Sequence, residues 1–416
     1  MNTLVLSWEY PPRIVGGLGK HVHALATALA AEGHEVHVVT RGSPGAPGEE
    51  FADGVHIMRV EESPPEIAFD DQLVPWVLQF NIGVAERAIE LLRDERIDVV
   101  HAHDWLVAYA AAAVRSAFGV PLVATVHATE FGRHQGYLPG PMNKLIHEVE
   151  WWLAYEAKRV ITCSSFMAEQ VRDIFAVPAS KQDVIPNGVD LGDFGEPDGR
   201  DAFRASRLRA GEKMVFFAGR LEYEKGVQTV LEALPLVLAF EDVRFFVAGV
   251  GTHATALHDH AARLGIADRV EFLGFVATDE LSMFLGSADL VVVPSLYEPF
   301  GMVALETMAS GTPCIAADTG GLRELVVHDA TGLRFRPGDP HSLADTILRL
   351  TTEPRLAKRI TVDARRFISD QFSWISIARR TVEVYRRAAE EDDIEQVPLR
   401  AQFTASPLLT RNLSGA

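Results

Sequence analysis

The sequence contains little cysteine. Among its 416 residues, only Cys163 and Cys314 are cysteines, and they lie far apart. Two such residues match no metal-ligand spacing and cannot form the disulfide framework of a small secreted domain. A chain of this length buries a large core without disulfides, and typical domain sizes predict roughly two or three domains. The cysteine content is typical of a reducing compartment, so we expect a cytoplasmic location.

Long apolar runs are also missing. The N-terminal stretch MNTLVLSWEYPP lacks the basic start and long apolar segment of a signal peptide. No run approaches the roughly 20 apolar residues of a membrane span, so we expect no transmembrane segment, and contact with a membrane surface stays open. A hydrophobic content of 48% with 23% charged residues excludes a largely disordered chain, although residues 390–416 read as a flexible tail.

Basic residues are outnumbered by acidic ones. The chain has 39 Lys and Arg against 57 Asp and Glu, which gives a net charge of −18. A surface this acidic repels the phosphate backbone of nucleic acids, so no nucleic-acid partner is expected. The charge leaves the oligomeric state open.

Short β-branched apolar runs alternate with helical patterns in both halves of the chain. Such runs are typical of parallel strands covered by helices on both faces. The strands expected in the first half are 4–6, 36–39, 99–100, 122–126 and 160–162. Those expected in the second half are 215–218, 245–248, 270–273, 290–293 and 314–316. The sequence therefore predicts an α/β protein with two doubly wound, Rossmann-like domains that face a central cleft.

The composition also predicts the domain boundaries. An N-terminal domain over 1–185 is followed by a connection over 186–211 that is rich in glycine, proline and charge. A second domain covers 212–371, and a helix over 372–389 is expected to pack back on the first domain, before the tail from 390 to 416. Doubly wound sheets bind ligands beyond the carboxyl ends of their strands, so functional residues are expected there.

A glycine-rich segment, Gly16-Gly17-Leu18-Gly19, lies between the first expected strand and the first expected helix. Bare backbone amides and a positive helix end suit a phosphate group. A simple glycine turn explains the segment equally well when it is taken alone. The full dinucleotide fingerprint G-x-G-x-x-G is absent, which disfavours a nicotinamide-dependent dehydrogenase.

Two cations follow the expected strand 215–218. Arg220 and Lys225 belong to one loop, and a guanidinium and an ammonium together suit a diphosphate leaving group. The alternative is that they pair with Glu222 and Glu224 at the surface, and this loop alone favours that alternative.

Two carboxylates follow the expected strand 290–293. Glu298 comes in the next loop and Glu306 in the next helix. Because a carboxylate accepts paired hydrogen bonds from vicinal hydroxyls, Glu298 is suited to a sugar ring and Glu306 to a ribose. The alternatives are a charge at a helix start for Glu298 and a solvated helix face for Glu306.

Histidines end two of the expected strands. His127 follows 122–126, where an imidazole can donate to a sugar hydroxyl or stabilise positive charge at a reacting carbon, although a lone histidine there is more often structural. His101-Ala102-His103-Asp104 suggests a rival function, a metal hydrolase. No second cluster of suitable pattern completes a ligand set, so no metal is expected.

Together, these motifs resemble the retaining GT-B-fold glycosyltransferases of family 4, in particular their glycogen-synthase-like group. The motifs that carry the resemblance are Gly16-Gly17-Leu18-Gly19, His127-Ala128-Thr129-Glu130, Pro186-Asn187-Gly188-Val189-Asp190, Gly219-Arg220-Leu221 with Glu224-Lys225-Gly226, and Glu298-Pro299-Phe300-Gly301 through Glu306. The stretch from Thr125 to Arg133, with Ser7-Trp8-Glu9-Tyr10-Pro11-Pro12, is similar to bacterial α-1,4-glucosyltransferases that elongate glycogen or methylated glucan chains.

The resemblance implies a retaining transfer of glucose from ADP-glucose or UDP-glucose to an α-1,4-glucan or related oligosaccharide. It implies neither a metal nor a tightly bound cofactor. The alternative within this fold is a hexosyl (mannosyl) transferase that acts on a small-molecule or lipid acceptor. A nucleotide-sugar-binding protein without turnover is an alternative of another class.

The resemblance also assigns residues. The catalytic group is His127, Arg220, Lys225 and Glu298, with His127 beside the transferred sugar. The donor contacts are Gly16, Gly17, Arg220, Lys225, Glu298, Phe300, Gly301, Met302 and Glu306. The lysine-x-glycine-glycine motif of glycogen synthases is absent, because Val15 directly precedes Gly16-Gly17. This difference leaves part of the phosphate contact unassigned.

Overall fold

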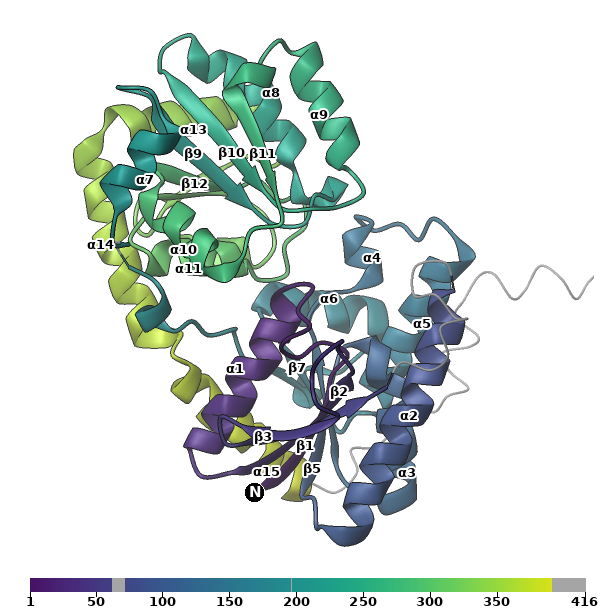
Figure 1. Ribbon diagram of the computed structural model, residues 1–416. Helices are drawn as coiled ribbons and strands as arrows, with labels where there is room; N and C mark the ends of the chain where they lie inside the picture. Colours follow the sequence, from purple (N-terminus) through teal and green to yellow (C-terminus); the bar gives the residue numbers. More distant parts are fainter. Residues whose placement is uncertain (62–71, 196, 391–416) are drawn as a thin grey trace, which may run out of the picture.

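The computed structural model describes residues 1–61, 72–195 and 197–390, and it contains two sheets flanked by helices (Figure 1). The first sheet has the order β3-β4-β2-β1-β5-β6-β7-β8 and is parallel except for the β3–β4 pair. The second has the order β11-β10-β9-β12-β13-β14 and is parallel throughout. The predicted α/β class with two doubly wound sheets is confirmed.

The strands and α-helices have the following bounds, in chain order. The strands of the first sheet are β1 (Asn2–Leu6), β2 (Glu35–Arg41), β3 (Glu49–Ala52), β4 (Val55–Val60), β5 (Val99–His103), β6 (Leu122–Val126), β7 (Arg159–Thr162) and β8 (Gln182–Val184). Those of the second are β9 (Lys213–Ala218), β10 (Val243–Ala248), β11 (Val270–Gly274), β12 (Leu290–Val293), β13 (Cys314–Ala317) and β14 (Leu333–Phe335). The helices are α1 (Gly17–Ala31), α2 (Leu73–Asp94), α3 (Ala108–Phe118), α4 (Glu130–Arg133), α5 (Pro141–Glu156), α6 (Ser165–Phe175), α7 (Arg200–Arg207), α8 (Val227–Leu238), α9 (Ala254–Arg263), α10 (Thr278–Ser287), α11 (Met302–Ala309), α12 (Leu322–Leu325), α13 (Pro340–Thr352), α14 (Pro354–Gln371) and α15 (Trp374–Glu390).

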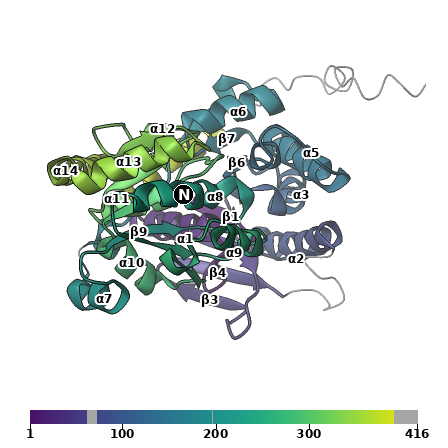
Figure 2. The same ribbon diagram turned by 90° about the horizontal axis from the view of Figure 1, so that it is seen from above.

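The central strands are buried along their whole length. Every residue of β5, β6, β12 and β13 is buried, because helices cover both faces of each sheet. In Figure 2, β9 lies between α13 and α14 on one side and α7 and α10 on the other. This two-sided burial explains why these strands read as nearly continuous apolar runs in the sequence.

The strand order reverses once in each sheet. In the first sheet the chain moves outward from β1 to β2 and then returns to place β5 on the other side of β1. In the second sheet the corresponding reversal lies between β9 and β12. At such a switch point the connections leave in opposite directions, which opens a crevice at the carboxyl ends of the two strands. The loops after β1, β5, β9 and β12 are therefore the places where this fold can hold a ligand.

The last helix returns to the first sheet. Helix α15 packs against α1, β5 and β6, with Ile377, Val382 and Tyr385 buried (Figure 1). The segment 186–211 is not all loop, because it includes α7, whose Phe203 ring packs edge-on against Phe284 of the second domain. Apart from Glu390, which ends α15, the predicted tail lies outside the described residues.

None of the helices in the described part of the chain is both long enough and apolar enough to cross a lipid bilayer.

Candidate functional site

Two residues predicted to act together meet at the switch point of the second sheet. Lys225 ends a short 3-10 turn after β9, and Glu298 lies in the loop after β12. The Nζ atom of Lys225 lies 2.8 Å from Oε2 of Glu298, and the Ser295 hydroxyl donates to the same oxygen at 3.0 Å. A cation and a carboxylate that are far apart in sequence are therefore adjacent at the place where the fold binds ligands.

A glycine makes this approach possible. Gly226 has a φ of +72° and lies against the carbonyl group of Pro294, where a Cβ atom would overlap the carbonyl oxygen. The left-handed conformation and the missing side chain together bring the Lys225 turn against the end of β12. This local backbone requirement explains why glycine follows Lys225 directly.

Arg220 belongs to the same loop but is more exposed. Its side chain is 46% exposed, and Nη2 lies 3.4 Å from Oε1 of Glu224. The alternative of surface ion pairs is thus correct for Arg220, which pairs with Glu224. It is wrong for Lys225, which pairs with Glu298, while Glu222 accepts hydrogen bonds from Thr252. An exposed pair of this kind contributes at most about 1 kcal/mol, so the guanidinium can turn to an anion at little cost.

Glu306 lies on α11 and is buried, with 4% of its surface exposed. The alternative of a solvated helix face is therefore wrong. Its Oε1 atom accepts a hydrogen bond at 3.1 Å from Nζ of Lys20, which comes from α1 in the first domain. Lys20 was not predicted as a site residue, although it follows Gly19 directly. Lys20 therefore brings a cation to the glycine-rich segment, which lacks the lysine-x-glycine-glycine motif.

The amides of the glycine-rich segment are partly used within the protein. The backbone N–H groups of Val15 and Gly16 donate to Oε2 of Glu9 at 2.8 and 3.0 Å. Burial raises the pKa of Glu9. Gly17, in contrast, faces the second domain, since a Cβ atom there would lie 3.4 Å from Cγ of Met302. The two glycines predicted to contact phosphate thus differ. The backbone N–H of Gly16 donates a hydrogen bond to Glu9, and Gly17 lies at the interface between the domains.

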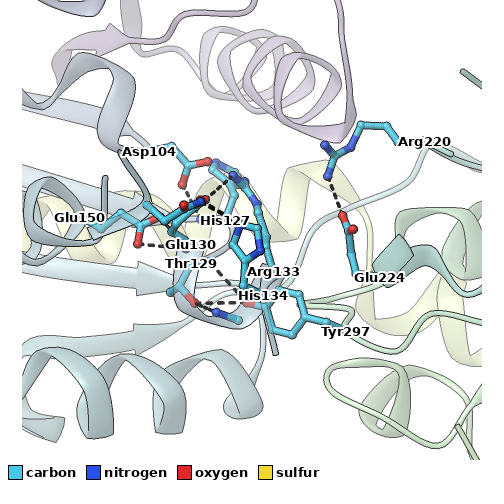
Figure 3. Close-up of polar contacts among 12 residues, drawn as sticks. Asp104, His127, Thr129, Glu130, Arg133, His134, Glu150, Arg220, Glu224 and Tyr297 are labelled. Atoms are coloured by element: carbon cyan, nitrogen blue, oxygen red, sulfur yellow. Dashed lines mark hydrogen bonds and ion pairs between the residues drawn. The ribbon is translucent and has the colours of Figure 1, made fainter. Parts of the chain in front are cut away.

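His127 lies at the end of β6, as the sequence indicated (Figure 3). Its Nε2 atom is 3.0 Å from Nδ1 of His103, and its backbone N–H donates to Oδ1 of Asp104 at 2.8 Å. Burial, together with the nearby positive charge of Arg133, lowers the pKa of His127 to about 3. The imidazole is therefore neutral at neutral pH and can serve a ligand through one hydrogen bond without carrying charge.

Three carboxyl groups surround Arg133 on the same side of the interface. Figure 3 shows Asp104, Glu130 and Glu150 gathered near its side chain, while the pair of Arg220 and Glu224 lies across from them. Burial raises the pKa of Asp104 to about 6 and that of Glu150 to about 8. Burial raises the pKa of Glu150 by more than the Arg133 guanidinium and the backbone N–H of Glu130 lower it, so Glu150 holds a proton at neutral pH.

The proton on Glu150 should make the free energy of unfolding depend on pH. The folded-state pKa of Glu150 lies above the ordinary value of 4.5, so the free energy of unfolding falls as the pH rises from about 4.5 to about 8, where the unfolded chain is ionised and the folded protein still holds the proton, and the loss is complete above pH 8. The Glu150→Gln variant keeps an oxygen for the backbone N–H of Glu130, which now donates to both Glu150 oxygens. We expect this variant to equal the wild type in urea unfolding near pH 5 and to exceed it by roughly 1–3 kcal/mol at pH 9. Parallel pH profiles for the two proteins would contradict the assignment.

Tyr297 crosses from the second domain into the first. Its hydroxyl donates to Oε1 of Gln170 at 2.9 Å and accepts from the backbone N–H of Thr129 at 3.4 Å. The ring lies directly against Gly132, where a Cβ atom would collide with it. The residue immediately before Glu298 therefore fixes the position of that loop against the end of β6.

Further contacts join the two domains beside Tyr297. The hydroxyl of Ser164 donates to the carbonyl oxygen of Pro299 at 2.6 Å. The carboxylate of Glu324 accepts from the backbone N–H groups of Ser165 and Phe166 at 3.0 and 2.9 Å, at the start of α6. A negative charge at a helix N-terminus is stabilised by the helix dipole. These contacts hold the carboxyl edges of the two sheets toward each other.

The metal grouping suggested by His101-Ala102-His103-Asp104 does not form. Nδ1 of His101 lies 2.7 Å from the Tyr385 hydroxyl, and Nε2 lies 2.7 Å from the Thr125 hydroxyl, so both ring nitrogens are engaged in the core. His101 is structural.

Two known protein families match the chain, one over most of the first sheet and one over the second. Residues 15–193 match the model described as glycosyltransferase family 4, and residues 199–367 match the model described as glycosyl transferases group 1. The glycogen synthase of Mycobacterium tuberculosis (strain CDC 1551 / Oshkosh) is 38% identical over 93% of this chain and 95% of its own length. The D-inositol 3-phosphate glycosyltransferase of Kineococcus radiotolerans is 33% identical over 92% of each chain.

Solved structures share the architecture. The sucrose-phosphate synthase of Thermosynechococcus elongatus superposes with a TM-score of 0.81 at 25% identity, over 93% of this chain and 98% of the other. Anabaena HepE in complex with UDP-glucose superposes with a TM-score of 0.73 at 24% identity, over 93% and 99% of the two chains. The latter likeness supports the fold, with its two facing sheets.

Proposed function

The chain belongs to the glycosyltransferases of group 1 and family 4 and has the GT-B fold, and from this premise we propose that it transfers glucose from ADP-glucose or UDP-glucose to an α-1,4-glucan or related oligosaccharide. The observation that carries the proposal is the contact of Lys225 with Glu298 at the switch point of the second sheet. It places a cation suited to a diphosphate beside a carboxylate suited to sugar hydroxyls. The match with a glycogen synthase along nearly the whole chain supports the glucan acceptor.

The donor is assigned mainly to the second domain. Arg220 and Lys225 hold the diphosphate, Glu298 holds the glucose hydroxyls and Glu306 holds the ribose. The first N–H groups of a helix have no partner within it, so the start of α11 at Met302, with the preceding amides of Phe300 and Gly301, is suited to the glucose and phosphate oxygens. Gly17 approaches from the other domain, next to Met302.

The proposed reaction retains the α-configuration. The bond between the glucose C1 atom and the diphosphate oxygen breaks while Arg220 and Lys225 stabilise the charge that develops on the diphosphate. The acceptor hydroxyl attacks C1 from the same face and passes its proton to the departing phosphate oxygen. The neutral imidazole of His127 supports the sugar as positive charge develops at C1. No metal ion takes part in this scheme.

Lys20 provides a test of the donor assignment. Replacing it with alanine leaves the buried Glu306 carboxylate without its cation and adds uncompensated negative charge beside the diphosphate. A hydrogen bond to a charged group contributes roughly 1.5 kcal/mol or more, so we expect the KM for the donor to rise about tenfold. Lys20→Arg keeps the charge and should stay near the wild type. An unchanged donor KM in Lys20→Ala removes Glu306 and Lys20 from the donor site.

The function is tested by measuring nucleoside diphosphate release from ADP-glucose, UDP-glucose, GDP-glucose and GDP-mannose, with and without maltooligosaccharide and with a chelator present. We expect release from ADP-glucose or UDP-glucose that depends on the maltooligosaccharide and is insensitive to the chelator. Release only from GDP-mannose, or only with a small or lipid acceptor such as D-inositol 3-phosphate, supports the alternative transferase. Donor binding without any release supports a protein that has lost turnover.

A further inference from the structure

Three histidines from three different elements meet at the switch point of the first sheet. They are His21 on α1, His103 at the end of β5 and His127 after β6. One ring nitrogen of each lies within 4.8 Å of the corresponding atoms of the other two. His103 and His127 are the closest pair, with Nδ1 and Nε2 3.0 Å apart, and the His21 ring centroid lies 4.8 Å from that of His127.

The nitrogens of this trio are poorly satisfied by the protein. His21 is 5% exposed and His103 is fully buried. Neither ring nitrogen of His21 has a partner within 3.5 Å among the described residues, and Nδ1 of His103 faces another imidazole nitrogen, Nε2 of His127. The side chain of Asn187 lies beside His21 and acts to raise the pKa of its imidazole, against the larger effect of burial. Buried polar atoms in proteins nearly always have a partner, so this set of unused donors and acceptors calls for a ligand. His101, with both nitrogens bonded, shows the contrast.

The chemistry of the trio fits a transition-metal ion. Burial lowers the pKa of all three imidazoles, which holds them in the neutral form that binds metals. Zinc takes histidine nitrogens at about 2.0–2.1 Å in tetrahedral geometry, which sets ligand atoms roughly 3.4 Å apart. That spacing lies inside the range that the three nitrogens already span. Magnesium prefers oxygen ligands, so a nucleotide-bound magnesium ion does not fit here.

We propose that His21, His103 and His127 form a binding site for Zn²⁺, with water at the fourth position, and that occupation of this site blocks transfer by fixing the His127 imidazole on the ion, away from the sugar. The binding half of the proposal stands on the histidine geometry alone. The blocking half rests on the proposed function, because it requires His127 to act beside the transferred glucose. The ion is therefore an inhibitor and takes no part in the reaction.

Binding is tested on the full chain after treatment with a chelator and dialysis. Calorimetric titration with Zn²⁺ should show one tight site, and X-ray absorption of the zinc-loaded wild type should show three imidazole ligands, a result that depends on no variant. His21→Gln should weaken the affinity at least about tenfold, because even the loss of a residue that only orients a metal ligand costs that much. His37→Gln is the control, since His37 belongs to the other candidate metal group, with Glu35 and Glu95. No tight site in the wild type, fewer than three imidazoles, or an effect of His37→Gln alone overturns the proposal.

Blocking is tested with the transferase assay. Zn²⁺ should inhibit the wild type, a chelator should restore the rate, and His21→Gln should need at least about ten times more Zn²⁺ for the same inhibition. Zinc bound at the trio without inhibition overturns the blocking role. If no donor is turned over at all, the proposed function fails, while the calorimetric and absorption results still decide the metal site.

Discussion

Replacing Arg220 with alanine should lower the kcat for glucosyl transfer by about 100- to 1,000-fold while leaving the fold intact. A preorganised group that stabilises charge developing in the transition state typically contributes this much to the rate. Arg220 is nearly half exposed and pairs with Glu224 at 3.4 Å. Its loss should therefore cost at most about 1 kcal/mol of unfolding free energy. Steady-state kinetics and urea unfolding of the same preparation separate the two effects.

Glu224→Gln is the matched control for Arg220→Ala. It removes the same surface ion pair but leaves the guanidinium in place, so the transfer rate should stay within a few-fold of the wild type. If the two variants lose activity equally, the ion pair matters through structure and Arg220 is not the diphosphate ligand. If Arg220→Ala keeps the full rate, the site assignment on the second domain fails.

Replacing Glu298 with glutamine should produce the second large effect, a fall in kcat/KM of about 100- to 1,000-fold. The carboxylate now accepts hydrogen bonds from Lys225 at 2.8 Å and from Ser295 at 3.0 Å. The amide loses one acceptor and the negative charge, so it can neither position Lys225 nor accept paired hydrogen bonds from glucose hydroxyls. Kinetics with a fixed acceptor and a varied donor measure the effect.

Ser295→Ala is the graded control for Glu298. It removes a single neutral donor from the same Oε2 atom and leaves the charge, so we expect a loss of only several-fold, in line with roughly 1 kcal/mol for one hydrogen bond. A Glu298→Gln enzyme that keeps its activity within the range of Ser295→Ala shows that the carboxylate does not hold the sugar.

The sequence predicted the two parallel sheets because their inner strands are buried on both faces. Strand β6 was located to the residue, since Leu122–Val126 is fully buried and His127 follows it directly. Strands β3, β4, β8 and β14 were missed. Of these, β3 is only four residues long, with exposed positions alternating with half-buried ones, and the edge strands β8 and β14 are three residues long each. Short edge strands carry too little apolar pattern to be distinguished from loops.

The contacts of the site were harder to predict than its members. Lys225 and Glu298 were both singled out, but their contact depends on the order of β9 and β12, which local patterns do not encode. The pairing of Lys20 with Glu306 depends on how the two domains meet. His21 reads as an ordinary helix residue until α1 places it beside His103 and His127. The sequence did not predict these contacts because they join residues that are far apart in the chain.

Proton NMR of a single reaction shows whether the enzyme transfers glucose to a glucan with retention of the α-configuration. Enzyme, ADP-glucose or UDP-glucose, and maltopentaose are mixed, and the anomeric signals are followed with time. We expect the donor signal to decline while a new α-glucosidic signal on the glucan grows in equal amount. A β-linked product, release of free glucose alone, or a donor signal that does not change would contradict it.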